Sequence, residues 1–286
     1  MSVFVSTSSL NKKINLSGMI SLFEKSGLKN IELGVWQKVD KKEFDVIKKS
    51  QCNFVVHQYF PPPESPFIIN LSSPNKKILG KSISQIKKSI DFCRNFKIDL
   101  FTFHSGFRID PDINFKFNYK KNSIPDYGTS FKIFKGAIKK IVKYAESKNI
   151  KLALENNVIE DHNLVKGKNL ILLMVEYWEF EKLFKEVPSE NFGMLLDLGH
   201  LNVSANILNF NKYEFIEKIK DRVFAIHFHE NSGRKDEHKK IKKNSWCLKA
   251  INKWFQNKKI PLIMEGHYSS IKELTNSKNL IEKLLK

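Results

Sequence analysis

The sequence has little cysteine, little arginine and no long hydrophobic run. Cys52, Cys93 and Cys247 are too few and too widely spaced for a disulfide framework, and no C-x-x-C motif occurs, which favours a reducing compartment. The N-terminus has no charged segment before an apolar stretch, so it does not resemble a secretory signal. The most apolar run, residues 170–175, is far shorter than the roughly 20 residues that cross a bilayer. We therefore expect a cytoplasmic protein that does not enter the membrane.

Lysine supplies nearly all of a large positive charge. The formal net charge of the 286 residues is +19, but only four of the 49 basic residues are arginine. Arginine is the residue best suited to bidentate contacts with phosphate and guanine. Lysine pairs such as Lys48-Lys49 and Lys139-Lys140 are spread along the chain, mostly on segments expected to be solvated helices. Charge alone therefore disfavours a dedicated nucleic-acid-binding protein without excluding one.

Short apolar segments alternate with helical patterns along the whole chain. Eight segments are typical of strands buried on both faces, namely 3–6, 30–33, 54–57, 100–104, 151–155, 193–197, 223–227 and 261–265. Helices are expected at 16–26, 83–96, 131–148, 170–184, 211–219, 246–256 and 270–285. The alternation predicts a single (β/α)8 TIM barrel over residues 1–286. A doubly wound sheet is the alternative, but no glycine-rich phosphate turn follows the first strand.

Histidines and acids stand at the ends of the expected strands: Glu32, His57, His104, Glu155, Asp197, His200, His227 and Glu265. A barrel places its active site at the C-terminal ends of its strands, so we expect these residues in one mouth. Taken singly, each of these residues is explained by an ordinary structural role, either as a buried histidine whose hydrogen bonds are satisfied or as an acid that caps a helix. Taken together, imidazoles and carboxylates are the ligand set of divalent metal ions. Because no cysteine ligand is present, the pattern predicts a catalytic metal site and not structural zinc.

The same residues carry a resemblance, over essentially the whole chain, to the xylose isomerase-like barrel superfamily, which includes sugar isomerases and epimerases and endonuclease IV. The resemblance implies one divalent ion (Mn, Zn, Co, Fe or Mg) held by four residues: Glu155, Asp197, His227 and Glu265. His200 completes the D-x-x-H pattern that begins at Asp197. The spacing to Glu230 favours His227 over His229 as the ligand, and His229 stays unassigned.

The endonuclease IV branch is matched at further positions. His57 with its following Ile-Asn-Leu segment, His104-Ser105-Gly106 and Asp236-Glu237-His238 resemble motifs of that family. The resemblance implies up to two additional ions. One would be held by His57, His104 and Glu155, and the other by His200, Asp236 and His238. Clustered divalent ions suit phosphodiester cleavage, so an endonuclease acting on abasic DNA is the alternative function.

The isomerase and epimerase branch is favoured because several nuclease features are missing. The first strand lacks a Gly-Ala-His-x-Ser opening, and residues 31–33 read Ile-Glu-Leu, as in sugar isomerases. No Gly-x-Gly follows Asp236 and His238, so these two residues fit a solvated loop equally well. The favoured function is a metal-dependent isomerase or epimerase of a sugar or sugar phosphate. By this resemblance Glu155 and Glu265 move a proton next to a carbonyl, through an enediolate.

Substrate contacts are expected from His200, Arg234 and Arg108. Arg234 stands close to where epimerases place a substrate-binding arginine, and His200 would bind a hydroxyl. Loop 106–130 carries Arg108 among aromatic and cationic residues: Phe115, Phe117, Tyr119, Lys120, Lys121 and Tyr127. Such a loop is suited to bind a polar or anionic ligand. The alternative is that its aromatic side chains pack against one another and only stabilise the loop. The expected partner is a small carbohydrate; a homo-oligomer is left open, and a catalytically inactive binding module is disfavoured by the retained acids.

Overall fold

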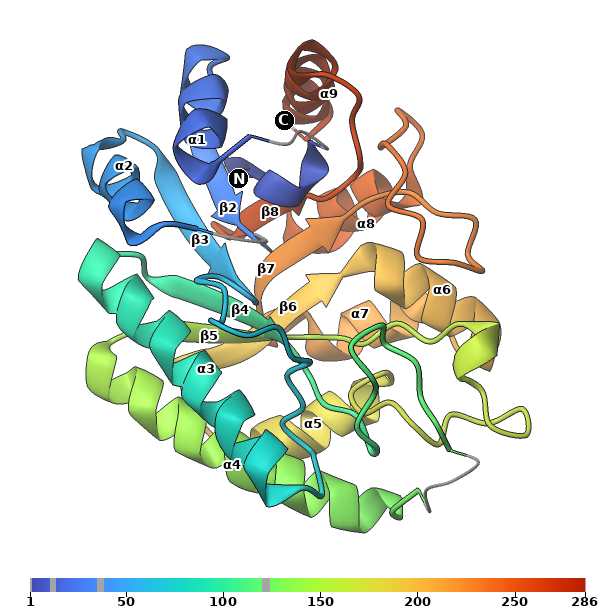
Figure 1. Cartoon of the computed structure of the whole chain (residues 1–286). Helices are drawn as coiled ribbons and strands as arrows, with labels where there is room; N and C mark the ends of the chain where they lie inside the picture. Colours follow the sequence, from blue (N-terminus) through green and yellow to red (C-terminus); the bar gives the residue numbers. More distant parts are fainter. Residues whose placement is uncertain (1, 11–13, 35–38, 120–123, 286) are drawn as a thin grey trace.

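The computed structural model describes residues 2–10, 14–34, 39–119 and 124–285 and shows a closed barrel of eight parallel strands. The strands are β1 (Ser2–Ser6), β2 (Asn30–Leu33), β3 (Asn53–His57), β4 (Leu100–His104), β5 (Lys151–Glu155), β6 (Phe192–Asp197), β7 (Val223–Phe228) and β8 (Pro261–Met264). They pair in chain order, and β1 pairs with β8 to close the barrel (Figure 1). The expected (β/α)8 barrel is confirmed. Lys120 and Lys121 of the long loop lie outside the described residues.

The interior of the barrel is filled by a small apolar layer, which consists of Phe4, Val55, Leu100, Ala153, Leu195, Ala225 and Ile263. Side chains along a strand alternate between the two faces, so the residues between these positions point outward. In β5, for example, Leu152 and Leu154 face the helices and join the large outer core. The barrel is therefore a packed core and not a pore, as its fold requires.

Helices form an outer ring around the strands (Figure 1). They are α1 (Leu16–Lys25), α2 (Phe44–Lys49), α3 (Lys76–Phe96), α4 (Tyr127–Lys148), α5 (Tyr177–Glu186), α6 (Leu198–Leu208), α7 (Lys212–Ile219), α8 (Trp246–Phe255) and α9 (Ile271–Leu284). Local caps explain several starts. Asn75 Oδ1 accepts the backbone N–H of Lys77 at α3, and Asp126 Oδ1 accepts that of Thr129 at α4.

The helix predicted over residues 170–184 is wrong in its first half. The structure begins α5 at Tyr177, after a capping box in which the Glu176 and Glu179 side chains each accept a backbone N–H. Residues 170–176 form a loop in which Ile171 and Val175 are buried in a separate apolar cluster. The misassignment has a physical cause, because a buried loop and the buried face of a helix present the same apolar residues.

Two other helices are not predicted by the hydrophobic periodicity of the sequence. The α6 helix is buried over residues 198–205 on all sides, so it shows no amphipathic stripe that would reveal it. The short α2 helix was also not expected. The α3 helix begins at Lys76, several residues before the predicted position 83, because Asn75 caps it there.

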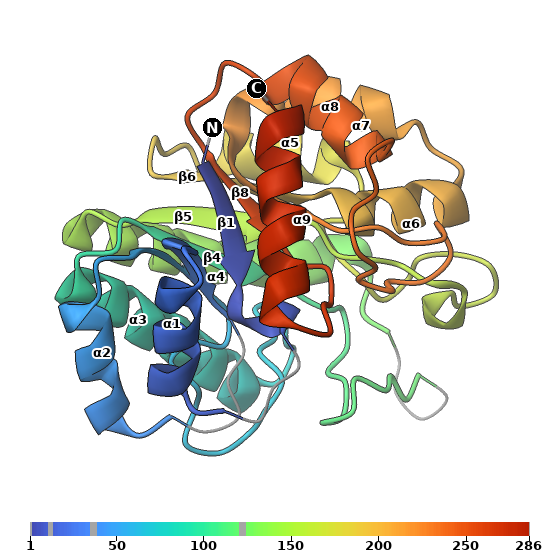
Figure 2. The ribbon, with the colours of Figure 1, turned by 90° about the horizontal axis from the view of Figure 1, so that it is seen from above.

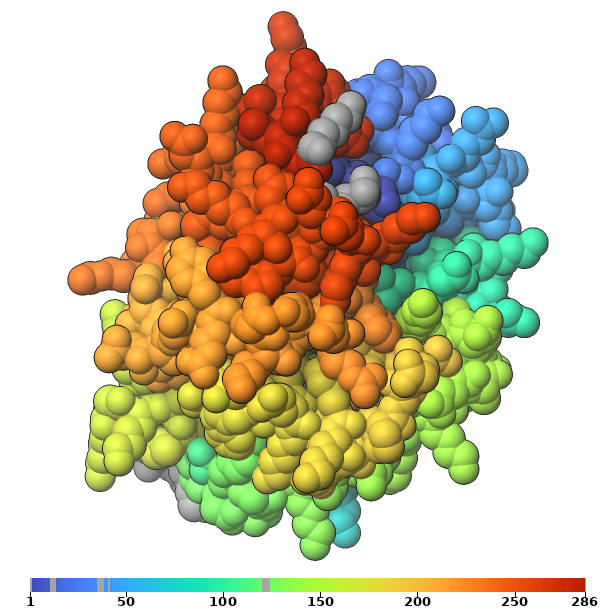
Figure 3. Space-filling view, turned by 180° about the vertical axis from the view of Figure 1, so that it is seen from behind, coloured from blue at the N-terminus to red at the C-terminus, as the bar shows by residue number. Residues whose placement is uncertain are grey.

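The two ends of the chain meet in the structure. Figure 2 shows β1 beside α9, and Figure 3 shows the first (blue) and last (red) parts of the chain adjoining on one face. Ser9 Oγ donates a hydrogen bond to the Met264 carbonyl at 2.8 Å, and Leu10 forms a β-bridge with Tyr268. In the described part of the chain, none of the helices combines the length and apolar character needed to cross a membrane.

Candidate metal centre at the barrel mouth

Strand alternation points the predicted ligands into the mouth of the barrel. Ala153 of β5 belongs to the inner layer, and Glu155 follows it by two positions; Ala225 and His227 of β7 stand in the same relation. The same spacing directs three further residues inward: His57, Asp197 and Glu265. All of these ligand candidates are buried. The residues predicted at strand ends are thus brought together because a period of two carries them to the inner face.

Glu155 lies at the centre of the site. Its Oε2 atom is 3.0 Å from His104 Nδ1 and 3.6 Å from His57 Nε2. Its Oε1 atom is 3.3 Å from His200 Nδ1 and 3.6 Å from His227 Nδ1. Burial alone would raise the pKa of the Glu155 carboxyl, but the histidines, His104 above all, lower it below its ordinary value. One carboxylate therefore faces four imidazole rings.

His227 is held between carboxylates. Its Nε2 is 2.7 Å from Glu32 Oε2, while its Nδ1 is 3.0 Å from Glu265 Oε2 and 3.8 Å from Asp197 Oδ2. Burial alone would lower the pKa of His227, but Glu265 and Glu32 raise it well above the ordinary value. Glu32 thereby fixes the ring so that Nδ1 is turned toward the other candidate ligands.

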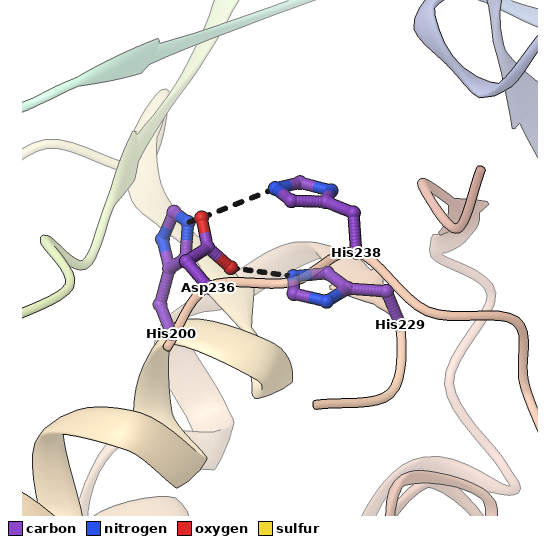
Figure 4. Close-up of side chains that lie close together, drawn as sticks. All are labelled: His200, His229, Asp236 and His238. Atoms are coloured by element: carbon purple, nitrogen blue, oxygen red, sulfur yellow. Dashed lines mark hydrogen bonds and ion pairs between the residues drawn. The ribbon is translucent and has the colours of Figure 1, made fainter. Parts of the chain in front are cut away.

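The loop after β7 brings two further predicted ligands to the site. Asp236 Oδ2 is 3.2 Å from His200 Nε2 and 3.1 Å from His238 Nε2. His229, which the sequence left unassigned, lies with its Nε2 3.4 Å from Asp236 Oδ1 (Figure 4). Burial alone would lower the pKa of His238, but Asp236 and Glu265 raise it to about 9. Asp236 and His238 therefore belong to the cluster and do not form a solvated loop.

The unpaired atoms of the cluster fit a metal ion. Within the described part of the chain, six buried atoms of these residues make no hydrogen bond: Glu32 Oε1, Glu155 Oε2, Asp197 Oδ2, His227 Nδ1, His229 Nε2 and Asp236 Oδ1. Unpaired buried polar atoms destabilise a fold, and here they face one another. Their residues fall into groups whose ligand atoms lie within 4.8 Å of each other, including Asp197-His227-Glu265, His57-His104-Glu155 and His200-His229-Asp236-His238. Imidazole and carboxylate donors suit divalent ions.

A cavity of about 420 Å³ opens beside His104 and His200. Three loops build it, those that follow β3, β4 and β5. Its apolar wall includes Tyr59, Phe107 and Phe117, and the rings of the last two pack edge to face with centroids 5.4 Å apart. A concave, mostly apolar pocket beside a few polar groups is the usual form of a small-ligand site.

The fold and these ligands can be compared with known proteins. A family described as "Xylose isomerase-like TIM barrel" matches residues 22–284. The chain belongs to this family. The match covers nearly every strand and helix described above, including all the candidate ligands.

The proteins that are similar to this chain carry different names. An uncharacterised protein of Methanocaldococcus jannaschii is 24% identical over 176 residues, which cover 60% of this chain and only 52% of that protein. The "Probable endonuclease 4" of Aquifex aeolicus is 25% identical over 225 residues, 73% of this chain and 68% of that one. A solved D-tagatose 3-epimerase-like protein superposes with a TM-score of 0.77 at 19% identity, covering 100% of this chain and 97% of the other. At that identity the superposition shows the fold alone.

Two arginines predicted from the sequence make no hydrogen bond or ion pair with the cluster of this xylose isomerase-like barrel. The Arg108 guanidinium donates to the Pro125 carbonyl from Nε at 3.0 Å and Nη2 at 2.5 Å, and Arg108 does not line the cavity. The substrate contact expected of Arg108 is therefore not supported, because its guanidinium holds the loop. Arg234 is exposed and makes no hydrogen bond or ion pair with the described residues, and its substrate role stays a prediction.

Three polar residues that the sequence did not single out contact the candidate ligands or line the cavity beside them. Asn156 Oδ1 accepts the Asp197 N–H at 2.8 Å, and its side-chain Nδ2 donates to the Asp197 carbonyl at 3.0 Å. Thr102 Oγ1 is 2.8 Å from His57 Nδ1. Gln58 is buried and lines the cavity, where its Oε1 has no hydrogen-bond partner in the described part of the chain. In the sequence, these three residues are indicated only by their position beside or near the predicted strand-end ligands.

Proposed function

We propose that the chain is a divalent-metal-dependent sugar isomerase or epimerase in which Glu155 and Glu265 move a proton to and from a carbon next to a carbonyl. The observation that carries this proposal is the convergence of two carboxylates on one ring nitrogen. Glu155 Oε1 lies 3.6 Å and Glu265 Oε2 lies 3.0 Å from His227 Nδ1. They come from β5 and from the end of β8, on different arcs of the mouth. Carboxylates that flank one point can remove a proton on one side and return it on the other.

The supporting residues hold the two acids and their neighbours in place. Glu155, Asp197, His227 and Glu265 would hold the metal ion, which when bound stabilises negative charge that develops on the substrate oxygen. Glu32 orients His227 through its Nε2. The Asn156 side chain forms two hydrogen bonds with the Asp197 backbone, and Asp197 Oδ1 accepts the His200 N–H at 2.7 Å. The substrate therefore meets pre-oriented groups.

The cavity supports a carbohydrate as the substrate. The rings of Phe107 and Phe117 offer apolar surface to the C–H face of a sugar, and Gln58 Oε1 is available to accept a hydroxyl hydrogen. The hydroxyl-binding role expected of His200, which also lines the cavity, stays a prediction, and Gln58 is proposed beside it. Both ring nitrogens of His200 already have protein partners, the Asn156 carbonyl at 2.9 Å and Asp236 Oδ2 at 3.2 Å.

A second candidate is an endonuclease IV-like phosphodiesterase acting on abasic DNA. The observation that favours it is the approach of Asp236 and His238 to His200, which completes the third group of candidate ligands. Several divalent ions side by side would suit in-line attack on a phosphodiester. The Aquifex relative carries the corresponding name.

A paired assay separates the two candidates. Metal-loaded protein is incubated in deuterated water with a panel of ketoses and ketose phosphates, and deuterium at carbon is read by mass spectrometry. The same preparation is tested for incision of an abasic duplex over a range of salt, because lysine-driven DNA binding weakens as salt rises. The proposal expects metal-dependent exchange on at least one sugar. Metal-dependent incision at low enzyme concentration with no exchange on any sugar would promote the nuclease instead.

A further inference from the structure

The cavity beside His104 and His200 has more room and more apolar surface than a bare sugar needs. Its volume of about 420 Å³ lies within the roughly 300–1,000 Å³ of cavities that hold drug-sized ligands, which are larger than one hexose. We propose that the cavity binds an uncharged, apolar substituent of the substrate, such as an aromatic group, and disfavours a phosphate at the same place. This inference rests on the proposed function, because it names the class of sugar on which that site acts.

The cavity adjoins the two acids of the proposed proton transfer. His104 and His200 line it, and ring nitrogens of these two residues lie 3.0 Å and 3.3 Å from the carboxylate oxygens of Glu155. Glu155 and Glu265 themselves are not among the described residues that line the cavity. A substrate whose reacting carbon lies between the two acids would therefore extend its far end into the cavity.

Polar and apolar lining residues come from different parts of the loops. Gln58, His104 and Asn157 stand at or within two residues of the ends of β3, β4 and β5, close to the barrel mouth. Farther from the strand ends, the loops contribute a largely apolar wall: Ile69, Phe107, Phe115, Phe117 and Leu172. The residues near the strand ends can therefore bind sugar hydroxyls, while the wall offers its surface to an apolar group.

The apolar wall is already formed without a ligand. Phe107 forms a β-bridge with Leu172, and both belong to an apolar cluster shared by the loops after β4 and β5. The ring centroid of Phe107 lies 5.4 Å from that of Phe117 and 6.5 Å from that of Phe115. Asp112 Oδ1 fixes the turn that carries these two rings by accepting two backbone N–H groups. A preformed wall binds an apolar group without the cost of ordering a loop.

The charge of the lining disfavours a phosphate. Glu160 lines the cavity, where its Oε1 accepts the Asp236 N–H at 2.9 Å and its Oε2 lies 3.4 Å from His162 Nδ1. No lysine or arginine is among the lining residues that the structure describes. A phosphate would therefore meet a carboxylate, and removing an uncompensated charge from water is costly. An apolar substituent avoids this cost and also covers Phe115, which is 52% exposed.

The test uses sugars that differ only in the group on O6, which is remote from the carbons next to the carbonyl. Each D-ketohexose is compared with its 6-phosphate and its 6-O-benzyl ether. Calorimetry on zinc- or manganese-loaded protein gives the dissociation constants, so binding is measured whether or not exchange occurs. We expect the benzyl ether to bind about 10–100-fold more tightly than the free sugar, and the phosphate no more tightly than the free sugar. A phosphate that binds as tightly as the benzyl ether, or no gain from the benzyl group with any ketohexose, would overturn the proposal.

Two single variants locate the gain in affinity. Phe117 is partly buried in the cavity wall, whereas Ile113 lies on the same loop, is 55% exposed and does not line this cavity. Phe117→Ala should reduce the ratio of free-sugar to benzyl-ether dissociation constants about 10-fold, because it removes a ring from the wall. Ile113→Ala should keep the ratio of the natural chain. Equal ratios in the two variants would overturn the assignment of the cavity.

Deuterium exchange on the same sugars tests the proposed function separately. Exchange that is fastest with the benzyl ether would support both the reaction and the apolar site. A benzyl gain that depends on Phe117, without exchange on any ketohexose, would support the apolar site and count against the isomerase or epimerase. Exchange on a ketose 6-phosphate in preference to its benzyl ether would support the reaction and overturn the apolar site.

Discussion

At the scale of single residues, the space around His229 depends on one missing methyl group. A Cβ at Gly199 would lie 2.1 Å from His229 Cε1 and 2.2 Å from its Nε2. Gly199 stands in the first turn of α6, next to His200, so its backbone cannot retreat without moving that ligand. The close approach therefore couples the first turn of α6 to the His229 ring.

We expect Gly199→Ala to displace the His229 ring from Asp236 and to lower stability by about 1–3 kcal/mol. Gly136→Ala in α4 is the matched control, because a Cβ there meets nothing within 4 Å. That control should be neutral or stabilising by up to about 1 kcal/mol. Urea unfolding provides the readout. Equal urea midpoints for the two variants would show that the close approach of Gly199 to His229 does not constrain α6.

Asp197 and His227 are expected to bind metal at little cost to the fold. Asp197→Ala and His227→Ala should each abolish binding of the ion that these two residues would share with Glu155 and Glu265, while the far-ultraviolet circular dichroism stays unchanged. The reason is that the barrel is stabilised mainly by its packed layers, which lie below these residues. Unchanged metal content in both variants would show that the ligand assignment is wrong.

The strand-end ligands could be predicted from the sequence because each is fixed by its own strand. His57 and Glu155 end apolar segments, and the period of two then decides which face they take. Asp236 could not be placed in this way. Its contact with His200 joins a loop to a helix that shows no amphipathic pattern, so the path of the loop decides it.

At the scale of elements, α5 begins with a buried acid. Glu179 is 3% exposed, and its Oε2 accepts the backbone N–H groups of Val175 and Glu176. Burial raises the pKa of Glu179 from 4.5 to about 7, and the hydrogen bonds oppose this only in part. The folded chain thus keeps a proton that the unfolded chain loses earlier. The resulting stabilisation is complete below pH 4.5 and is lost as the pH rises through about 7.

Glu179→Gln should remove this dependence on pH. Relative to the natural chain, the variant should gain stability between pH 5 and pH 8, by up to about 3 kcal/mol at pH 8, because its amide does not ionise. Urea midpoints at the two pH values measure the difference. Glu181→Gln, at an exposed position of the same helix, should leave the pH dependence unchanged. Parallel pH profiles for the natural chain and Glu179→Gln would contradict the assignment.

At the scale of the whole molecule, the barrel separates the apolar layers that stabilise it from the polar mouth where the candidate ligands lie. The alternation of eight strands with helices made this architecture predictable. The cavity was not predictable, because it forms only where three loops converge, with Tyr59, Phe107 and Asn157 contributed by separate parts of the chain. Loop paths also explain why the Arg108 guanidinium lies against the Pro125 carbonyl.

Metal removal should lower the stability of the whole barrel. An ion at 100 times its dissociation constant stabilises the folded state by about 2.7 kcal/mol, which corresponds to about 5–10 °C in melting temperature for a chain of this size. We expect chelator-treated protein to melt lower by about this amount and to recover when zinc or manganese is restored. An identical melting temperature with and without chelator would indicate that the clustered side chains bind no ion.

The most direct test of the central claim, that two acids on one metal centre transfer a proton, measures carbon-bound deuterium exchange in Glu155→Gln and Glu265→Gln. Each amide keeps an oxygen for the metal but does not take up a proton at neutral pH. With a sugar that the natural chain exchanges, each variant should lose about 10²–10⁴-fold in exchange rate while its measured metal content stays close to one ion at that centre. Exchange at the natural rate in either fully metal-loaded variant would contradict the account.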